Sequence, residues 1–300
     1  MSALVVLVVG LVAGIVVQRR HRLPPGAVTA VNAWLLDIAL PALVLHEVHA
    51  VRFPGDLALV VAAPYLLYAV TTALYLLAAR PMRLGRETVT ALVAATAVAN
   101  TSFVGFPMAT VFYGAGSVPI AVLVDQLGSF LLLNTVVLST VTIVAGASLP
   151  RAALARRVLT APALLALLAA LALRPVTFPD WLDSALVSLG ATLTPLALFS
   201  IGMQLQVRAV RQWWRELALG LGVKLVIAPA IVVGLYALTG RLGDHAVTIA
   251  LFETAMPPMV AGALIASRHG LAPPLPSLLV GVGVPLAFVT LPLWSLVLGS

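Results

Sequence analysis

"NTSFVGFP", residues 100–107, places an amide, two hydroxyls, a glycine and a proline within an otherwise apolar stretch of the chain. A second stretch, "ETAMPPM" at 253–259, interrupts another apolar run in the same way. Proline removes a backbone donor and clashes with the carbonyl one turn before it, so each stretch should break a helix. In lipid, a freed backbone group costs several kcal/mol unless another group satisfies it. Both breaks therefore belong in the protein interior or beside a water-filled cavity.

The composition of the chain is that of a membrane protein. Apolar residues make up 62% of the chain and charged residues 9%, whereas soluble domains have about 25% charged residues. The chain has no cysteine, and its five histidines form no metal-binding motif. We therefore expect no enzyme activity, no cofactor and no metal site. The formal charge of +7 reflects the arginine bias of membrane loops rather than a nucleic-acid partner.

Hydropathy predicts an all-α integral membrane protein with ten transmembrane helices, because one span needs roughly 20 apolar residues. Thirteen arginines lie in the loops after the odd-numbered segments, and three lie in the loops on the other side. Under the positive-inside rule, the odd-numbered loops face the cytoplasm and both termini lie outside it, in a multi-pass protein of the inner (plasma) membrane. The ten predicted segments are approximately 2–18, 28–48, 57–79, 88–113, 117–145, 159–173, 182–205, 216–238, 246–267 and 275–298.

The two halves of the chain resemble each other, which predicts an internal repeat. "IALPALVLHEV" at 38–48 resembles "LTPLALFSIGM" at 193–203, and each break falls in the fourth predicted helix of its half. Five helices in each half turn the second half upside down in the membrane, a topology typical of secondary transporters. We expect a first five-helix repeat at 1–145, a cytoplasmic linker at 146–158 and an inverted second repeat at 159–300. Chance similarity between apolar sequences is the alternative explanation.

The paired breaks predict a substrate site, because interrupted helices at matching positions are the best sequence pointer to the site of a transporter. The restarted half-helices would aim unpaired amides and a partial positive charge at the midplane, which favours an anion, above all a carboxylate. Gly105 is expected to release the chain from helical geometry, and Pro107 to begin the restarted helix. A simple kink that neighbouring helices absorb is the alternative. The candidate residues are Asn100, Thr101, Ser102, Gly105, Pro107, Pro257 and Pro258.

Five pieces spread over nearly the whole chain carry a family resemblance: "VNAWLLDIALPALVLHE", "NTSFVGFPMATVFYG", "LVDQLGSFLLL", "PLALFSIGMQL" and "ETAMPPMVAGALIASRHG". They resemble the auxin efflux carrier family, which includes plant PIN proteins and many bacterial transporters. The resemblance implies a ten-helix fold of the PIN-like and bile acid:sodium symporter-like type, whose broken helices 4 and 9 cross at mid-membrane beside an organic-anion site. It adds Met256 to the substrate-binding residues. The third helix lacks the Asp and Lys of the plant carriers, so that part of their mechanism does not transfer to this chain. Bacterial relatives suggest small carboxylates such as malonate or malate as substrates. A homodimer is common in this fold.

Four ionisable residues lie well inside predicted helices and are candidates for carrying charge or coupling: Asp37, Asp125, Lys224 and Glu253. Each costs roughly 2.5–3.5 kcal/mol to insert in its charged form. Counting residues from the membrane surface puts Lys224 level with Asp37, so an Asp37–Lys224 pair is expected, with Lys224 snorkelling toward the cytoplasm as the alternative. Glu253 shares a face with the double proline one turn later, and its carboxylate would repel an anion unless protonated. Glu253 is therefore the first candidate for proton coupling and Asp125 the second, although a structural carboxylate bonded to backbone or to Asn134 is also consistent.

The leading hypothesis is a secondary transporter that exports a small organic anion by alternating access, driven by the membrane potential or by protons. No GxxxxGK[ST] motif for a nucleotide is present. The alternative is a sodium-coupled organic anion symporter of the bile-acid type, although no acidic cluster marks the breaks. An intramembrane enzyme lacks a plausible catalytic constellation, and a channel is a further alternative. The expected partners are the organic anion, the lipid bilayer and H+, with Na+ less favoured.

Overall fold

A computed structural model describes residues 2–20, 24, 26–49, 51, 55–148, 150–205 and 210–299. Within these residues every regular element is a helix, and one isolated β-bridge joins Ala99 to Pro258. The first half contains α1 (Ser2–Arg19), α2 (Ala27–Trp34), η1 (Leu35–Ala39), α3 (Leu40–His49), α4 (Leu57–Ala79), α5 (Arg86–Thr96), η2 (Thr101–Gly105), α6 (Phe106–Tyr113), η3 (Ala115–Ser117), α7 (Val118–Val124), η4 (Asp125–Ser129), α8 (Phe130–Leu132), η5 (Leu133–Val137) and α9 (Leu138–Val144). The second half contains α10 (Arg151–Leu159), α11 (Pro162–Ala172), α12 (Asp180–Ala191), α13 (Leu193–Gln204), α14 (Trp214–Gly222), η6 (Val223–Ile227), α15 (Ala228–Ala237), α16 (His245–Thr254), α17 (Val260–Arg268) and α18 (Leu275–Leu298). Arg22, Arg52 and Arg208, three of the loop arginines used for orientation, lie outside the described residues.

Six helical segments in the described part of the chain are long and apolar enough to cross a membrane. A seventh is counted if α10 and α11, which meet at an angle of 55°, form one span. The segments with the two breaks are divided into helices of 8 to 11 residues, each too short to cross alone. The chain is therefore an all-helical, multi-pass membrane protein, and the count of ten spans stays a prediction. The six segments are Ala27–His49, Leu57–Ala79, Ala115–Val144, Asp180–Gln204, Trp214–Ala237 and Leu275–Leu298.

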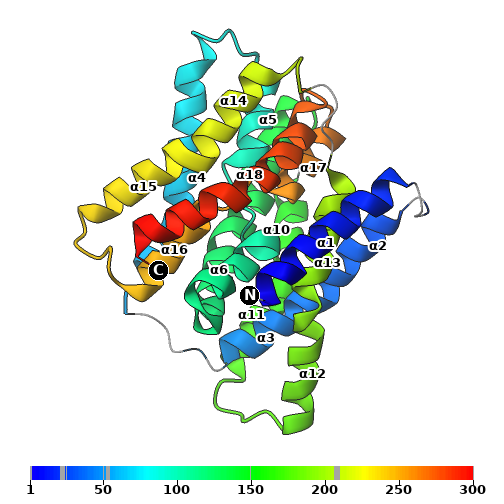
Figure 1. The fold of residues 1–300 in the computed structure, drawn as a ribbon, viewed down its shortest axis with the longest axis vertical. Helices are drawn as coiled ribbons and strands as arrows, with labels where there is room; N and C mark the ends of the chain where they lie inside the picture. Colours follow the sequence, from blue (N-terminus) through cyan, green and yellow to red (C-terminus); the bar gives the residue numbers. More distant parts are fainter. Residues whose placement is uncertain are drawn as a thin grey trace.

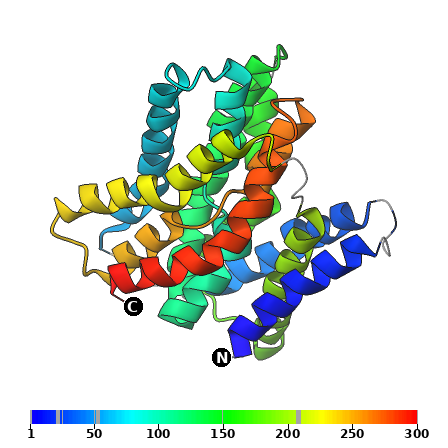
Figure 2. The ribbon, with the colours of Figure 1, turned by 45° about the horizontal axis from the view of Figure 1, so that its top comes forward.

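The helices form two groups that lie side by side (Figures 1 and 2). In the first group, α1 packs along α13, and α3 packs against α11 and α12. In the second group, α4 packs against α15 and α16, while α5 packs against α17 and α18. Figure 2 shows the first group, blue and yellow-green, beside the larger second group. Each group takes helices from both halves of the chain, so the interface between the groups is not a boundary in the sequence.

Glycines allow the close approach of α1 and α13 within the first group. A Cβ added at Gly14 would lie 2.2 Å from the carbonyl oxygen of Phe199, and one added at Gly202 would lie 2.3 Å from that of Leu11. Small residues are the usual means by which helices pack closely in lipid, where no hydrophobic effect drives them together. Large apolar side chains such as Leu77 and Leu296 point outward instead and remain exposed, as lipid-facing side chains do.

The predicted linker at 146–158 is largely helical. Residues Arg151–Leu159 form α10, which contacts η5 of the first half and then bends into α11. The segment was predicted as a connection because its arginines lower its hydropathy, yet alanine, leucine and arginine are also strong helix formers. The helix places Arg157 against the rest of the molecule, where its Nε donates a hydrogen bond of 3.0 Å to the Asn134 side-chain oxygen.

Candidate functional site

The first break follows α5. Helix α5 ends at Thr96, and the chain resumes helical geometry at Thr101 in the π-helical turn η2, which leads directly into α6. Pro107 lies in the first turn of α6, as its missing donor and fixed φ favour. The prediction for Gly105 is wrong, because its φ of −62° and ψ of −55° are helical. The chain leaves the helix earlier, between Thr96 and Asn100, so Gly105 has another role.

The second break lies between α16 and α17. Helix α16 ends at Thr254, and α17 begins at Val260. Pro257 and Pro258 lie between the two helices and lack the amide donors that would bond the last carbonyls of α16. The carbonyl of Thr254 is affected most, because its two possible helical donors, three and four residues later, are both proline.

The two breaks lie against each other. The Asn100 amide donates to the carbonyl oxygen of Pro257 at 3.1 Å, and the Met259 amide donates to that of Ala95 at 2.8 Å. These two bonds flank the antiparallel bridge between Ala99 and Pro258. Each non-helical stretch thus satisfies part of the backbone of the other, which is what permits irregular backbone inside an apolar protein.

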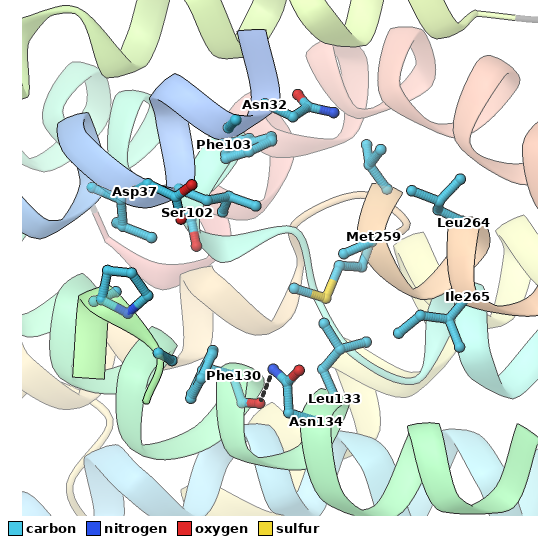
Figure 3. Close-up of a pocket in the computed structure, with 18 of the residues that line it drawn as sticks. Asn32, Asp37, Ser102, Phe103, Phe130, Leu133, Asn134, Met259, Leu264 and Ile265 are labelled. Atoms are coloured by element: carbon cyan, nitrogen blue, oxygen red, sulfur yellow. Dashed lines mark hydrogen bonds between the residues drawn. The ribbon is translucent and has the colours of Figure 1, made fainter. Parts of the chain in front are cut away.

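A cavity of about 660 Å³ lies beside the crossing, between the two helix groups (Figure 3). The first group supplies the α2–η1 segment, including Asn32 and Asp37, and the second supplies η2, η4 through η5, and α17. Apolar side chains form much of the wall, and Figure 3 shows Phe103, Met259 and Leu264 around the opening. Such a chamber, mostly apolar with a few polar groups, is the usual form of a small-molecule site.

The cavity receives the starts of both restarted half-helices. Ser102 and Phe103, in the first turn after the first break, line it, and so do Val260 and Ala261, in the first turn of α17. The first amides of a helix have no acceptor within the helix and carry a partial positive charge. The wall between these two turns is therefore suited to a negatively charged group.

Asn100 is the one amide side chain at the crossing with an unused donor. It lines the cavity, it is only 3% exposed, and its Nδ2 has no hydrogen-bond partner. A buried donor without a partner costs about 1–3 kcal/mol. Such a cost is accepted where a ligand supplies the missing acceptor.

Asp125 lies in the same wall and is held by three donors. The Thr101 and Ser102 hydroxyls both donate to its Oδ1, the latter at 2.6 Å, and Gln126 Nε2 donates to its Oδ2 at 2.8 Å. Asp125 is 2% exposed. The network ties η4 to the first turn after the break, so that a change of charge on Asp125 acts directly on the half-helix that carries Ser102.

Glu253 lies behind the crossing, in the last turn of α16. It is fully buried, and neither of its carboxylate oxygens has a hydrogen-bond partner. The expected alternative, a carboxylate bonded to backbone or to Asn134, is therefore wrong. Asn134 instead donates to the Phe130 carbonyl oxygen at 3.0 Å and accepts from Arg157 (Figure 3).

Gly105 makes the space that this carboxylate occupies. A Cβ at Gly105 would lie 2.0 Å from Glu253 Oε2 and 2.7 Å from its Cδ. Only glycine leaves room for the carboxylate at this contact. The role of Gly105 is therefore to let the two broken helices pack closely, and not to supply an unusual backbone conformation.

Lys224 is fully buried in the π-helical turn η6, and its Nζ donates to the Thr254 carbonyl oxygen at 3.0 Å. The predicted Asp37–Lys224 pair is wrong: Asp37 is exposed at the cavity wall, and no ion pair joins the two among the described residues. Counting depth along straight helices ignored both the direction of the side chain and the break in α16. The charge that acts on Lys224 is that of Glu253, and the full burial of Lys224 also excludes snorkelling.

The predicted substrate-binding residues divide into two sets. Asn100 and Ser102 line the cavity, together with the charged candidates Asp37 and Asp125. The others are buried in or behind the crossing and do not line it: Thr101, Gly105, Pro107, Met256, Pro257 and Pro258.

Several lining residues were missed from the sequence. Gln126 follows Asp125 directly and is fully buried, so a second polar side chain in an apolar helix was the available signal. Arg157 and Arg268 line the cavity as well, but in the sequence they read only as loop charges. Asn32 and Gln204 were not missed, because polar side chains in predicted helices either line a cavity or bond to another helix. Both line the cavity, and Asn32 also accepts a hydrogen bond of 2.6 Å from the Ser200 hydroxyl.

The fold and the cavity beside two broken helices define a multi-pass membrane transporter. Residues 149–295 match the family described as "Membrane transport protein", which is that of the auxin efflux carriers. The chain is also 25% identical over 274 residues to a protein named "Uncharacterized transporter" from Methanothermobacter thermautotrophicus. That similarity covers 90% of this chain and 89% of the relative.

Proposed function

We propose that this transporter carries a small organic anion, a carboxylate, across the membrane by alternating access. The proposal includes ten spans arranged as two inverted five-helix repeats, 1–145 and 159–300, joined by the segment 146–158. Six apolar spans, the bent pair α10–α11, the apolar helix α1 and the two interrupted pairs α5–α6 and α16–α17 together make ten segments, which supports this count. The protein would then lie in the inner (plasma) membrane, with both termini outside the cytoplasm.

The unpaired Asn100 side chain carries the proposal. Its Nδ2 is buried at a cavity wall that also holds the first turns of two half-helices. A carboxylate oxygen would accept from this amide and from the free backbone amides beside it, all of which favour negative charge. Thr101, Gly105, Pro107, Met256, Pro257 and Pro258 would act indirectly, by keeping the two breaks in contact.

The interface between the helix groups is where the transport motion would occur. The cavity has walls from both groups, so sliding or rocking of one group against the other would change its access. Arg157 and Arg268 line it, and both are among the arginines that the positive-inside rule assigns to the cytoplasmic side. The described conformation would therefore be open to the cytoplasm, the state that accepts an anion for export.

Protons would be coupled through the buried carboxylates. An anion at the cavity wall would lie beside Asp125, and the charge of Asp125 also acts on the buried Glu253. Like charges this close in an apolar interior repel strongly. Transport of a proton together with the anion would remove one of these repulsions. If the membrane potential alone drives export, moving one negative charge out of the cell releases about 2.3 kcal/mol at 100 mV.

A sodium-coupled symporter of organic anions is the alternative, and one observation favours it. Gln126 Oε1 and Ser129 Oγ are buried near Asp125 without partners, and oxygen atoms of this kind can bind Na+. Uptake of the anion that requires Na+ and cannot use a proton gradient would support this alternative.

A thermal-shift screen of carboxylates on the purified protein tests the anion site. Malonate or malate, compared with chloride at equal ionic strength, should raise the unfolding temperature of the wild type. Asn100→Ala should weaken binding about 10- to 100-fold, because it removes a hydrogen bond to a charged group. Asn134→Ala is the matched control, because both ends of that amide are engaged within the protein. A shift that survives Asn100→Ala undiminished would overturn the proposed site.

A further inference from the structure

The C-terminal end of α16 presents a carbonyl that its own helix cannot satisfy. The Thr254 oxygen would normally accept from the residue four positions later, or three in a tighter turn, but these are Pro258 and Pro257. The Met259 amide, the next available donor, bonds to Ala95 instead. Among the cationic side chains that the structure describes, the Lys224 ammonium bonds to this oxygen, at 3.0 Å.

The neighbouring side chain adds a negative charge to the same place. Glu253 precedes Thr254, is fully buried, and has two carboxylate oxygens without hydrogen-bond partners. Its charge and that of Lys224 act on each other. Carbonyl oxygens at the C-terminal ends of half-helices coordinate the coupling ion in many transporters, and a buried carboxylate beside them adds to the attraction for a cation.

We propose that the Lys224 ammonium is a tethered cation that takes the place of a bound coupling ion at the C-terminal end of α16. The inference rests on the proposed transport function, and it deepens it: the cycle of this chain should not need Na+ at this position. The lysine extends from η6 of the neighbouring segment, so its charge cannot leave during the cycle as a bound ion does. A π-helical turn at its position is typical of functional sites.

The test uses the full-length purified protein without any carboxylate, and compares unfolding temperatures in equal concentrations of NaCl and choline chloride. The wild type should unfold at the same temperature in both salts. Lys224→Met should unfold roughly 5 °C or more lower, because it leaves Thr254 and Glu253 buried without a cation. Na+ should then restore part of this loss and choline should not. Lys224→Met combined with Glu253→Gln should lose the response to Na+.

Glu87→Gln is the matched control, because it removes an exposed carboxylate in the first turn of α5 that does not line the cavity, and it should leave the wild-type insensitivity to Na+ unchanged. Lys224→Gln, which keeps a donor but no charge, should show the same gain of Na+ response if Lys224→Met does not fold. A wild type that Na+ stabilises would overturn the proposal. A Lys224 variant that is destabilised but indifferent to Na+ would also overturn it, because Lys224 would then be only a structural donor.

This result is independent of the anion site. The salt comparison contains no carboxylate, so a failed carboxylate screen leaves it interpretable. Conversely, a carboxylate shift that Asn100→Ala abolishes would stand even if Na+ stabilised the wild type, and would then favour the sodium-coupled alternative.

Discussion

Replacing Gly262 by alanine should separate the two broken helices. Gly262 lies in α17, where an added Cβ would be 1.9 Å from the carbonyl oxygen of Ala94 in α5. Carbon and oxygen atoms that are not bonded rarely approach within about 3 Å, so the helices would have to move apart by more than 1 Å. Both sides of this contact are backbone or Cβ, so no change of rotamer can relieve it.

The expected cost follows from the contacts that such a shift disturbs. Overpacking a tight interior costs about 1–3 kcal/mol. The bond from Met259 to Ala95, 2.8 Å long, lies one residue along α5 from the clash, and its loss would add about 1 kcal/mol. Alanine favours the helix over glycine by up to about 1 kcal/mol, which offsets part of this cost. The sum predicts a destabilisation of about 1–3 kcal/mol, or a fall of roughly 3–10 °C in unfolding temperature.

Thermal unfolding of the purified variant, with and without the carboxylate found by screening, measures both consequences. The carboxylate should stabilise Gly262→Ala less than the wild type, because the first turn of α17 at the cavity would be displaced. Gly222→Ala is the matched control, because a Cβ at this helical glycine would meet nothing within 4 Å. If Gly262→Ala unfolds no lower than Gly222→Ala and binds the carboxylate normally, the close contact of α5 with α17 does not hold the site together.

Two further substitutions test contacts around the crossing. Gly105→Ala should destabilise the wild type by about 1–3 kcal/mol in thermal unfolding, but by less than about 0.5 kcal/mol in a Glu253→Ala background, because the clash is with that carboxylate; an equal cost in both backgrounds would contradict the contact. Tyr75→Phe should cost about 1–3 kcal/mol, because the buried Tyr75 hydroxyl bonds to the Thr96 hydroxyl at 2.6 Å and to the Gly220 carbonyl oxygen at 3.2 Å; unchanged stability would show that these bonds contribute nothing.

The positions of the helices and of their breaks were predictable from local chemistry. The predicted segments 57–79 and 275–298 coincide with Leu57–Ala79 and Leu275–Leu298, because a long apolar run leaves the backbone no other way to satisfy its hydrogen bonds in lipid. Pro257 and Pro258 break α16 through a donor that is absent from the covalent structure itself, so no tertiary contact can restore it.

Partnerships between distant residues were not predictable in this way. The sequence indicates that Lys224 and Glu253 lie within helices, but it does not show which side chain faces which. The pair Asp37–Lys224 failed for that reason, as did the role assigned to Gly105. The role of a buried charge such as Lys224, or of a glycine such as Gly105, depends on which residue of another helix it contacts.

By itself, the amino-acid sequence determined that this protein is helical, that it crosses a membrane several times, and that two of its helices are broken at matching places. Those properties depend on residue types within one or two turns. Only the tertiary structure decided that the broken stretches bond to each other, that Asn100 lines a cavity with a free donor, and that Lys224 reaches the last carbonyl of α16. The physical reason is that these contacts join residues 30 to more than 150 positions apart, and the packing of whole helices selects them.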